Sequence, residues 1–484
     1  MLTVRPALCS LYLLLASCTP AQEYVTPDAF TYTVTQDLVY GVDTNYVGIP
    51  DTLLLDLYKP VGNTDFDRPL LVCAHGGSWL GGCKDDPNGI VPLVERFVRR
   101  GYVVASINYR LGWHKDDAVA DPVAGFPPSL WPEAYRAFYA ADSLEMVRAI
   151  YRGMQDMKGA IRFLLERSAL DSTCSDKVFV AGESAGAFIA LATAFLDRTE
   201  EKPASCGALP AAPSPDPQCA NITTPDCITR SWDPLTPAML QRPDLGPVEG
   251  HLNPDGGDFR IRGVAAFYGG VPLDAFQLDW WQGVDTPAVY LYHQRCDGVV
   301  LSGIARPFTT MSAFCNLGAT PWHTNYPRMA GSVALQQAFA TLDPAPPLLL
   351  DLTECPPFNP DLALFECARY ADNGSYHFTA DPGQRAANLS AWWAPLAIAP
   401  GACVNTAVPE PSSAVSRLFP NPTTTIVVVP EWVGTVVELI DLSGSVLRSE
   451  RLRGEGLSVA GLPAGTYLLR ETQHGRSALL VIAD

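Results

Sequence analysis

The sequence predicts an α/β protein with a mostly parallel eight-stranded sheet, helices on both faces of the sheet, and a small C-terminal β-sandwich. Two observations lead to this prediction. Up to about residue 400, short apolar and β-branched runs alternate with longer helix-period segments, which is typical of a parallel sheet covered by helices. After Ala402 the composition changes to a Pro/Ser stretch and then to short strand-like runs separated by turn residues.

Eight segments have the composition of strands, because they are rich in Val, Ile, Leu and Tyr and end in turn residues. They are residues 30–41, 51–60, 69–77, 102–110, 177–184, 261–270, 287–294 and 347–352. Helical periods lie between them at 89–100, 134–168, 185–198 and 331–342. No helix separates the first two strands, so we expect an antiparallel lead-in to a parallel sheet.

The N-terminal residues have the pattern of a secretory signal peptide. Arg5 precedes the apolar run ALCSLYLLLA, and small residues follow it. The apolar core is about ten residues long, half of what a membrane-spanning helix needs. Cleavage after Ala21 is predicted, which makes residues 1–21 the signal peptide. Cleavage before Cys18, as in a bacterial lipoprotein, is the alternative.

The rest of the chain divides into three parts. We predict a main α/β domain over residues 22–402, a linker over 403–416 and the β-sandwich over 417–484. Residues 199–258 interrupt the main domain with a Pro-, Asp- and Cys-rich excursion, and loops of this length are usually functional or disordered. Its cysteines favour an ordered excursion, and it is interpreted either as a cap over a pocket or as a passive surface insert.

The 13 cysteines fit an exported chain, since such chains meet oxidants and form disulfides. Local pairs are candidates, but sequence leaves the connectivity open. The candidates are Cys73 with Cys83, Cys296 with Cys315, Cys355 with Cys367, and pairing among Cys206, Cys219 and Cys227. No C-x-x-C pair occurs and the spacings are irregular, so no metal site is predicted.

The charge of the chain argues against a nucleic-acid partner. The formal net charge is −18, and no Lys/Arg run is longer than a pair. Phosphate binding needs a clustered basic footprint. The sequence therefore excludes this class of partner, and it also predicts no transmembrane segment.

The segment Gly182-Glu183-Ser184-Ala185-Gly186 joins a predicted strand directly to a predicted helix. A G-x-S-x-G turn in this context raises a serine above the sheet, and its glycines are required because the turn is strained and crowded. Ser184 is therefore the predicted nucleophile. Glu183, its neighbour, is a candidate pocket residue.

A second glycine-rich segment, His75-Gly76-Gly77-Ser78-Trp79, follows the third predicted strand. Residues without side chains let backbone N–H groups approach a developing oxyanion. Gly76 and Gly77 are the predicted donors together with Ala185, and Ser78 stays open as an alternative. Trp79 is a further candidate pocket residue.

A serine nucleophile also needs a histidine base and a carboxylate that orients the histidine. In this strand order both follow the serine, on loops after the seventh and eighth strands. His377 precedes a final helix and is the predicted base, with His323 as the alternative. Asp297 directly follows the seventh strand and is the predicted acid, ahead of Asp285 and Asp372.

Residues from about 30 to 400 resemble the α/β-hydrolase superfamily, and more narrowly its carboxylesterases and lipases. The segments LLLDLYKP, AHGGSWLGG, INYRLGW, QDMKGAIRFLLERS and VFVAGESAG follow in the order of that family. GESAG and INYRLG are most similar to type-B carboxylesterases, whereas Cys296-Asp297 and the shorter domain are more similar to bacterial esterases related to feruloyl and acetyl-xylan esterases. The resemblance implies ester hydrolysis through an acyl-enzyme, without metal or cofactor.

The last domain resembles the sorting domain of the type IX secretion system of Bacteroidetes. Three segments carry this resemblance: FPNP at 419–422, ELIDLSGSVL at 438–447 and LPAGTYLLR at 462–470. It implies export through the periplasm and across the outer membrane, with the type IX secretion machinery as a partner and a secreted or cell-surface location. A carbohydrate-binding sandwich is the alternative.

Together these features predict a secreted serine esterase in which Ser184 attacks, His377 acts as base and then acid, and Asp297 orients His377. Aromatic residues on the predicted loops permit an aryl or polymeric ester. They are Trp79, Trp113, Phe126, Trp131, Tyr268, Trp280 and Trp281. Two other interpretations remain: an amidase or peptidase on the same triad, and a non-catalytic surface-binding protein on a hydrolase scaffold.

Overall fold

The computed structural model describes six stretches of the chain. They are residues 24–114, 143–213, 235–307, 326–354, 376–401 and 423–483, apart from 274, 284, 400, 430–431, 442–444, 454–455 and 473–476. The chain divides into two compact units, Met1–Asn405 and Thr406–Asp484. Each unit is described by itself.

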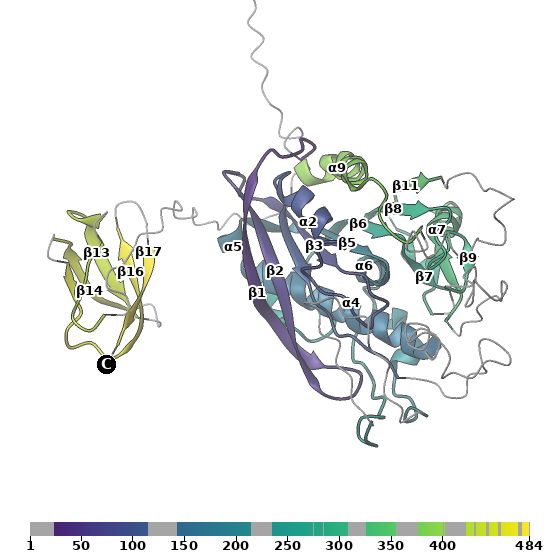
Figure 1. Ribbon diagram of the computed structural model, residues 1–484, viewed down its shortest axis with the longest axis horizontal. Helices are drawn as coiled ribbons and strands as arrows, with labels where there is room; N and C mark the ends of the chain where they lie inside the picture. Colours follow the sequence, from purple (N-terminus) through teal and green to yellow (C-terminus); the bar gives the residue numbers. More distant parts are fainter. Residues whose placement is uncertain are drawn as a thin grey trace, which may run out of the picture. The chain divides into compact units, whose positions relative to one another are not determined.

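The first unit contains one eight-stranded sheet in the order β1-β2-β4-β3-β5-β6-β8-β11 (Figure 1). Its strands are β1 (Thr31–Thr44), β2 (Pro50–Val61), β3 (Arg68–Ala74), β4 (Val103–Ile107), β5 (Thr173–Glu183), β6 (Ile261–Phe267), β8 (Ala288–Gln294) and β11 (Leu348–Thr353). All eight predicted strands are confirmed. The pairs β1–β2 and β2–β4 are antiparallel and the other five are parallel. The first two strands therefore form the antiparallel lead-in that the sequence predicted.

The helices alternate with these strands along the chain. They are α2 (Val91–Val98), α4 (Ser143–Glu166), α5 (Ser168–Asp171), α6 (Ala185–Phe195), α7 (Ser332–Phe339) and α9 (Pro382–Ile398), with 3-10 turns at Thr199–Glu201, Ala204–Cys206, Pro254–Gly256 and Leu278–Trp281. A three-stranded sheet that was not predicted joins β7 (Gly270–Pro272), β10 (Met329–Gly331) and β9 (Ile304–Ala305). Strands of two or three residues leave no period in a sequence, which explains why they were missed.

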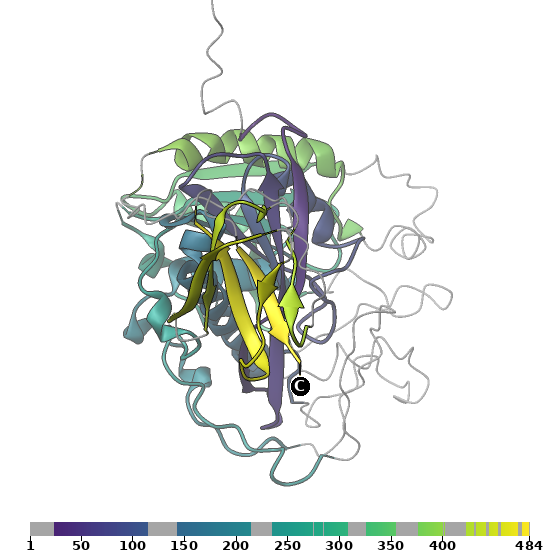
Figure 2. The same ribbon diagram turned by 90° about the vertical axis from the view of Figure 1, so that its left-hand side faces the viewer.

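Alternate residues of the central strands enter two apolar cores, one on each face of the sheet. Leu70 and Val72 of β3 pack with α4, α6 and α7, whereas Leu71 and Cys73 pack with α2 and α9. Figure 1 and Figure 2 show α9 along one side of the sheet and α4 along the other. This mostly parallel sheet with helices on both faces is the α/β-hydrolase fold that the sequence predicted.

The described parts of the excursion, residues 199–213 and 235–258, pack along α4. Buried side chains of α4 donate hydrogen bonds to backbone carbonyls of this segment. The donor–acceptor pairs are Arg148 with Ser205, Gly207 and Pro243, Tyr151 with Gly246, Gln155 with Leu245 and Pro247, and Arg162 with Glu249 and Leu252. The described parts of the excursion are thus anchored to α4; residues 214–234, with Cys219 and Cys227, lie outside the described residues.

The predicted pair of Cys73 with Cys83 is wrong, and Cys206 takes no part in the predicted pairing among Cys206, Cys219 and Cys227. Cys73 is a free thiol, fully buried in the middle of β3, where burial raises the pKa of the thiol. Its side chain points into the core under α2 and α9 and is not paired with Cys83. Cys206 is also a buried free thiol, so it takes no part in a pair with Cys219 or Cys227.

The second unit is a small antiparallel β structure. Its four-stranded sheet has the order β14-β13-β16-β17, and a two-stranded sheet pairs β12 with β15. The strands are β12 (Ile426–Val427), β13 (Val436–Ile440), β14 (Val446–Arg451), β15 (Leu457–Ser458), β16 (Gly465–Glu471) and β17 (Ser477–Ile482). One apolar core around Trp432, Leu439 and Leu469 lies among these strands, as expected for a β-sandwich.

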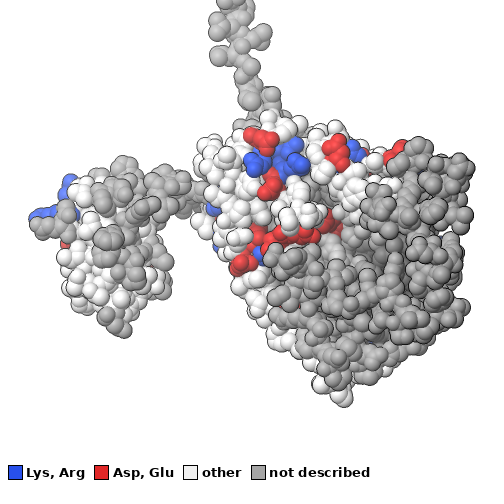
Figure 3. Space-filling model, viewed as in Figure 1, with Lys and Arg blue, Asp and Glu red and all other residues white. Residues whose placement is uncertain are grey.

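The surface carries charges of both signs. On the face shown in Figure 3, Lys and Arg side chains of the described residues lie in small groups beside acidic ones. Among the surface ion pairs of the described residues, Arg99 lies 3.7 Å from Asp28. Among the described helices, none combines the length and the apolar character that crossing a membrane requires.

One buried ion pair links the edge of the sheet to α4. Arg110 follows β4, and its Nε lies 2.9 Å from Asp156 Oδ1, while the Arg110 backbone N–H donates to Asp156 Oδ2 at 2.8 Å. The guanidinium also donates to the carbonyl of Thr44 and pairs with Asp43. Both members of the Arg110–Asp156 pair are almost completely removed from solvent.

We therefore predict that Asp156→Ala destabilises the first unit by about 3 kcal/mol, because it leaves a buried guanidinium without its main partner. Urea-induced unfolding measured by tryptophan fluorescence tests this. Asp285→Ala is the matched control, because Asp285 is 80% exposed and pairs with Arg260 at the surface; this change should cost less than about 1 kcal/mol. Equal losses for the two variants would contradict the prediction.

Candidate active site

Ser184 occupies the corner between β5 and α6. β5 ends at Glu183 and α6 begins at Ala185, and Ser184 between them has φ 50° and ψ −120°. A residue with a Cβ rarely adopts this conformation. Two backbone hydrogen bonds stabilise it: Ser184 N–H donates to the carbonyl of Phe267 on β6 at 2.9 Å, and Ala187 N–H donates to the carbonyl of Ser184 at 2.9 Å.

The two glycines of this corner are required by close backbone approach. A Cβ on Gly182 would lie 2.1 Å from the carbonyl oxygen of Gly186. A Cβ on Gly186 would lie 2.2 Å from the carbonyl oxygen of Ala74 at the end of β3. Both distances are far below van der Waals contact, so only glycine fits at either position. The spacing that the sequence showed is therefore explained by packing of the corner against β3.

The structure brings Ser184, His377 and Asp297 into one hydrogen-bonded chain. His377 Nε2 lies 2.7 Å from Ser184 Oγ, and His377 Nδ1 lies 2.7 Å from Asp297 Oδ2. Ser184 follows β5, Asp297 follows β8, and His377 lies between β11 and α9. Three distant segments meet here because the carboxyl ends of parallel strands share one edge of the sheet.

Asp297 is fully buried, and every described contact of its carboxylate comes from a hydrogen-bond donor. Oδ1 accepts the backbone N–H groups of Val299 at 2.9 Å and Val300 at 3.0 Å. Burial by itself would raise the pKa of Asp297. The electrostatic interaction with His377 and the hydrogen bonds from His293 and His377 outweigh burial, and the pKa is lowered. The group is thus kept as the anion that can orient an imidazole.

The loop that carries His377 is supported from the end of β8. Gln294 Nε2 donates to the carbonyl of Phe378 at 2.8 Å, and Ala380 N–H donates to the Tyr292 hydroxyl at 3.0 Å. The ring of Tyr268 packs edge-on against the His377 imidazole, with centroids 4.6 Å apart. The supporting roles of Tyr292 and Gln294 were missed, since their side chains act on a loop more than eighty residues away.

Two further histidines lie in the same unit, His75 and His114, and both are buried. Burial lowers the pKa of each to about 4. Asp285 is exposed and pairs with Arg260. His323 and Asp372 lie outside the described residues, as do Phe126 and Trp131.

The glycine-rich segment after β3 passes directly over Ser184. A Cβ on Gly76 would lie 3.2 Å from Ser184 Cβ. The Gly76 N–H donates to Glu183 Oε1 at 3.4 Å, whereas the N–H groups of Gly77 and Ser78 donate to no acceptor among the described residues. Gly77 and Ser78 both have positive φ, 110° and 54°. Of the three candidates in this segment, the structure leaves Gly77 and Ser78 free to donate.

The Glu183 carboxylate contacts two groups next to Ser184 and His377, the Gly76 N–H and the Tyr268 hydroxyl. Its Oε2 accepts the Tyr268 hydroxyl at 2.8 Å, and its Oε1 accepts Gly76 N–H. Burial raises the pKa of Glu183 to about 7; the nearby Asp86 adds to this shift, and the bonds from Tyr268 and Gly76 oppose it. Glu183 therefore links the glycine-rich segment to the aromatic ring that packs on His377.

Trp79, the second candidate pocket residue, lies in the core. Its side chain is 4% exposed, and its ring makes edge-on contacts with Phe188 and Trp113. Trp113 and Trp281 are equally buried. The Trp79 indole thus packs in the apolar core of the first unit.

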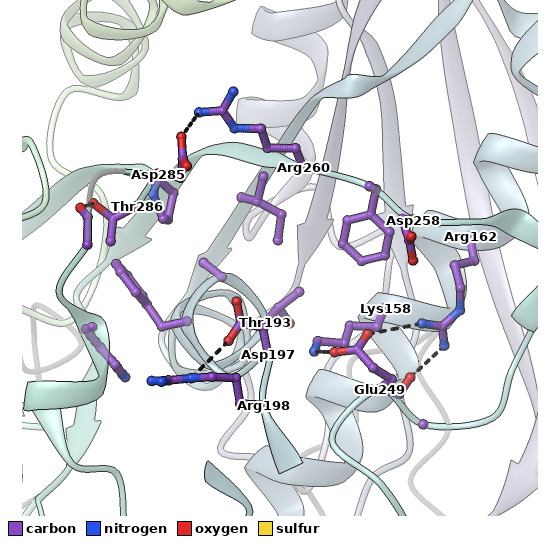
Figure 4. A pocket seen from close by; sticks show the side chains of 18 of the residues that line it. Lys158, Arg162, Thr193, Asp197, Arg198, Glu249, Asp258, Arg260, Asp285 and Thr286 are labelled. Carbon is purple, nitrogen blue, oxygen red and sulfur yellow. Dashed lines mark hydrogen bonds and ion pairs between the residues drawn. The ribbon is translucent and has the colours of Figure 1, made fainter. Parts of the chain in front are cut away.

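A cavity of about 870 Å³ lies between the carboxyl end of α6, α4 and the segment before β8. None of Ser184, Asp297 and His377 lines it. Figure 4 shows Lys158 and Arg162 converging on Glu249, Arg198 beside Asp197, and Arg260 paired with Asp285. Since each of these cations has an acidic partner, the cavity does not present an anion site, and it is separate from the candidate active site. No group of His, Cys, Asp and Glu suited to a metal ion occurs in the described residues.

Comparison with protein families gives a partial match. The BD-FAE family model matches residues 55–121, which include β3, the glycine-rich segment and β4. No curated protein matches the chain.

Solved structures with partial similarity include three hydrolases. Esterase 2 from Thermogutta terrifontis is 15% identical, with 72% of this chain and 91% of that chain covered and a TM-score of 0.30. An inhibited esterase B from Lactobacillus rhamnosis is 13% identical, with 74% and 85% covered and a TM-score of 0.34. The α/β hydrolase MGS-M1 from a Medee basin deep-sea metagenome library is 14% identical, with 76% and 98% covered and a TM-score of 0.36.

The raised pKa of Glu183 predicts a specific pH dependence of stability. The unfolded chain releases this proton near the ordinary value of 4.5, whereas the folded protein releases it near 7. The stability that the neutral acid provides is therefore lost as pH rises through this window. Relative to Glu183→Gln, the wild type should lose roughly 1–3 kcal/mol of unfolding free energy between about pH 5 and pH 9.

Urea unfolding of both proteins at the two pH values measures this difference. Glu354→Gln serves as the control, because Glu354 is 75% exposed and its removal should leave the pH dependence unchanged. A Glu183→Gln curve that stays parallel to the wild type across this range would contradict the assignment.

Proposed function

We propose that this protein is a secreted serine esterase that hydrolyses carboxylic esters through a covalent acyl-enzyme. The observation that carries the proposal is the continuous chain from Ser184 Oγ through His377 to Asp297, with both hydrogen bonds at 2.7 Å. A nucleophile, a base and an orienting carboxylate in this order form the constellation used for acyl transfer.

In the first half of the reaction, Ser184 Oγ attacks the ester carbonyl while His377 Nε2 accepts the serine proton. Asp297 fixes the imidazole so that Nε2 faces Ser184, and it stabilises the imidazolium that forms. The carbonyl oxygen becomes an oxyanion, which backbone N–H groups of Ala185 and of Gly77 or Ser78 would stabilise. His377 then returns its proton to the leaving alcohol as the C–O bond breaks.

In the second half, water replaces the alcohol. His377 takes a proton from water, the resulting hydroxide attacks the acyl carbon, and the same N–H groups stabilise the second oxyanion. His377 finally protonates Ser184 Oγ, and the carboxylic acid leaves. The His377 side chain is 12% exposed, so water can reach the ring. Every step uses only groups of the chain, the ester and water.

Two alternatives share the scaffold. An amidase or peptidase would use the same three side chains, and the esterase assignment is preferred because the segments around β3, β4 and β5 resemble carboxylesterases. A non-catalytic binding protein has no need for a strained serine within 2.7 Å of a histidine. The intact geometry favours an enzyme over this second alternative.

We further propose that the protein is exported and sorted by its C-terminal unit. Cys83, Cys174 and Cys296 are disulfide-bonded, which is consistent with an oxidising compartment. The LPAGTYLLR segment leads into and forms most of β16. The signal peptide and FPNP lie outside the described residues, and secretion by the type IX machinery rests on the resemblance of the sequence.

Ser184→Ala should lower the turnover of p-nitrophenyl esters, from acetate to decanoate, by at least about a thousandfold, since no other group can form the acyl-enzyme. Asp297→Asn should lower it by about a hundredfold or more, because the imidazole loses its orientation. The full mature chain is used, with circular dichroism to verify folding. Ser168→Ala in α5 is the control and should retain wild-type rates.

A fluorophosphonate probe gives an independent readout. It should add one mass increment to the peptide that contains Ser184 and none in Ser184→Ala. Equal turnover and equal labelling of both proteins would refute the nucleophile and leave a binding protein as the preferred function.

A further inference from the structure

A second histidine contacts the carboxylate of the triad. His293 lies in β8 and is completely buried, and its Nε2 is 3.3 Å from Asp297 Oδ2. The same oxygen is 2.7 Å from His377 Nδ1. Asp297 Oδ2 therefore contacts two imidazoles, His377 of the triad and His293 of β8.

The contacts of His293 define which ring nitrogen carries a proton. Nε2 is 2.7 Å from the carbonyl oxygen of Val300 and also faces Asp297, so both neighbours are acceptors and Nε2 must be the donor. Nδ1 lies 2.8 Å from Ser332 Oγ. In the neutral ring, Nδ1 accepts from the Ser332 hydroxyl, and this bond stabilises the Nε2–H tautomer.

Ser332 is itself fixed in place. It is the first residue of α7 and is fully buried. The turn before it approaches the Asp297 loop closely, since Gly331 N–H donates to the carbonyl of Gly303 and Val333 N–H donates to the carbonyl of Ser302. β8, the Asp297 loop and the β10–α7 corner thus meet around the His293 ring.

The Asp297 carboxylate is consequently approached by four donors, of which His293 is the most distant because its Nε2–H is shared with the Val300 carbonyl. Two backbone N–H groups bind Oδ1, and His377 and His293 share Oδ2. Because His293 takes up part of the charge on Oδ2, it limits how strongly that oxygen attracts a proton on His377. It also restrains the carboxylate in the plane that His377 requires.

We propose that His293 is a positioning residue for catalysis: it shares its Nε2–H between the Val300 carbonyl at 2.7 Å and Asp297 Oδ2 at 3.3 Å, and thereby sets the orientation and basicity of His377. The inference rests on the proposed function and extends it beyond the three triad residues. It needs no metal or cofactor and no proton transfer to or from His293.

The titratable groups around this centre are few in the described residues. Asp297 faces His293 and His377. Tyr268 packs on His377, and its hydroxyl donates to Glu183. The Glu183 contribution must be separated from that of His293, so the pH profiles are also measured in the Glu183→Gln background.

Two substitutions with equal polarity and different reach test the proposal. His293→Gln can place an amide N–H near the position of Nε2, whereas the shorter side chain of His293→Asn cannot reach Asp297. We expect Gln to keep kcat within about threefold of wild type and Asn to lower it about tenfold with little change in KM. The acidic limb of kcat/KM should move to higher pH in His293→Asn only, since the less neutralised carboxylate retains the proton of His377.

A wild-type pH profile in His293→Asn would overturn the proposal. So would equal losses in both variants that follow their unfolding temperatures, because a purely structural residue behaves in this way. These outcomes presuppose turnover by the wild type. If the wild type does not turn over esters, the proposed function fails first.

A readout without turnover tests the contact itself. In protein labelled with ¹⁵N-histidine, His293 should show a protonated Nε2 and an unprotonated Nδ1. The low-field proton of the His377–Asp297 bond should shift in His293→Asn and stay near its wild-type position in His293→Gln. An Nδ1–H tautomer at His293, or an unshifted proton in His293→Asn, would refute the inference even in an active enzyme.

Discussion

The close approach of three backbone segments at the β5–α6 corner is the constraint on which the site depends. Gly182 and Gly186 leave no space for a Cβ against each other and against the end of β3. This contact forces Ser184 into its strained conformation and brings the glycine-rich segment after β3 over the serine. The strain is sustained because the corner is built into the centre of an eight-stranded sheet, not into a free loop.

The parallel order of the sheet then determines what Ser184 meets. β5, β6, β8 and β11 are consecutive neighbours, so their carboxyl ends form one edge. The described groups of the site lie at this edge and come from the loops that follow these strands and β3. The antiparallel lead-in of β1 and β2 contributes no described side chain to the chain of hydrogen bonds from Ser184 to Asp297.

Charge at the site is controlled by buried polar contacts. Asp297 is surrounded by donors and stays ionised, whereas Glu183 is buried with fewer donors and near Asp86. Two carboxylates in one site therefore have pKa values displaced in opposite directions. The difference follows from the number of hydrogen-bond donors that each receives after burial.

The sequence by itself determined the eight strands, the principal helices and the order of the site residues along the chain. The strands and helices follow from local periodicity, and the place of the nucleophile follows from the glycines around Ser184. Both are patterns of neighbouring residues, which a sequence displays directly. Tertiary structure decided the rest. It separated Gly76 from Gly77 and Ser78 by the direction of one N–H group, buried Trp79 and Cys73, and turned Glu183 toward Tyr268. It also placed His293 against Asp297. Such contacts join residues far apart in the chain or depend on the orientation of a single side chain, and neither leaves a period or a motif.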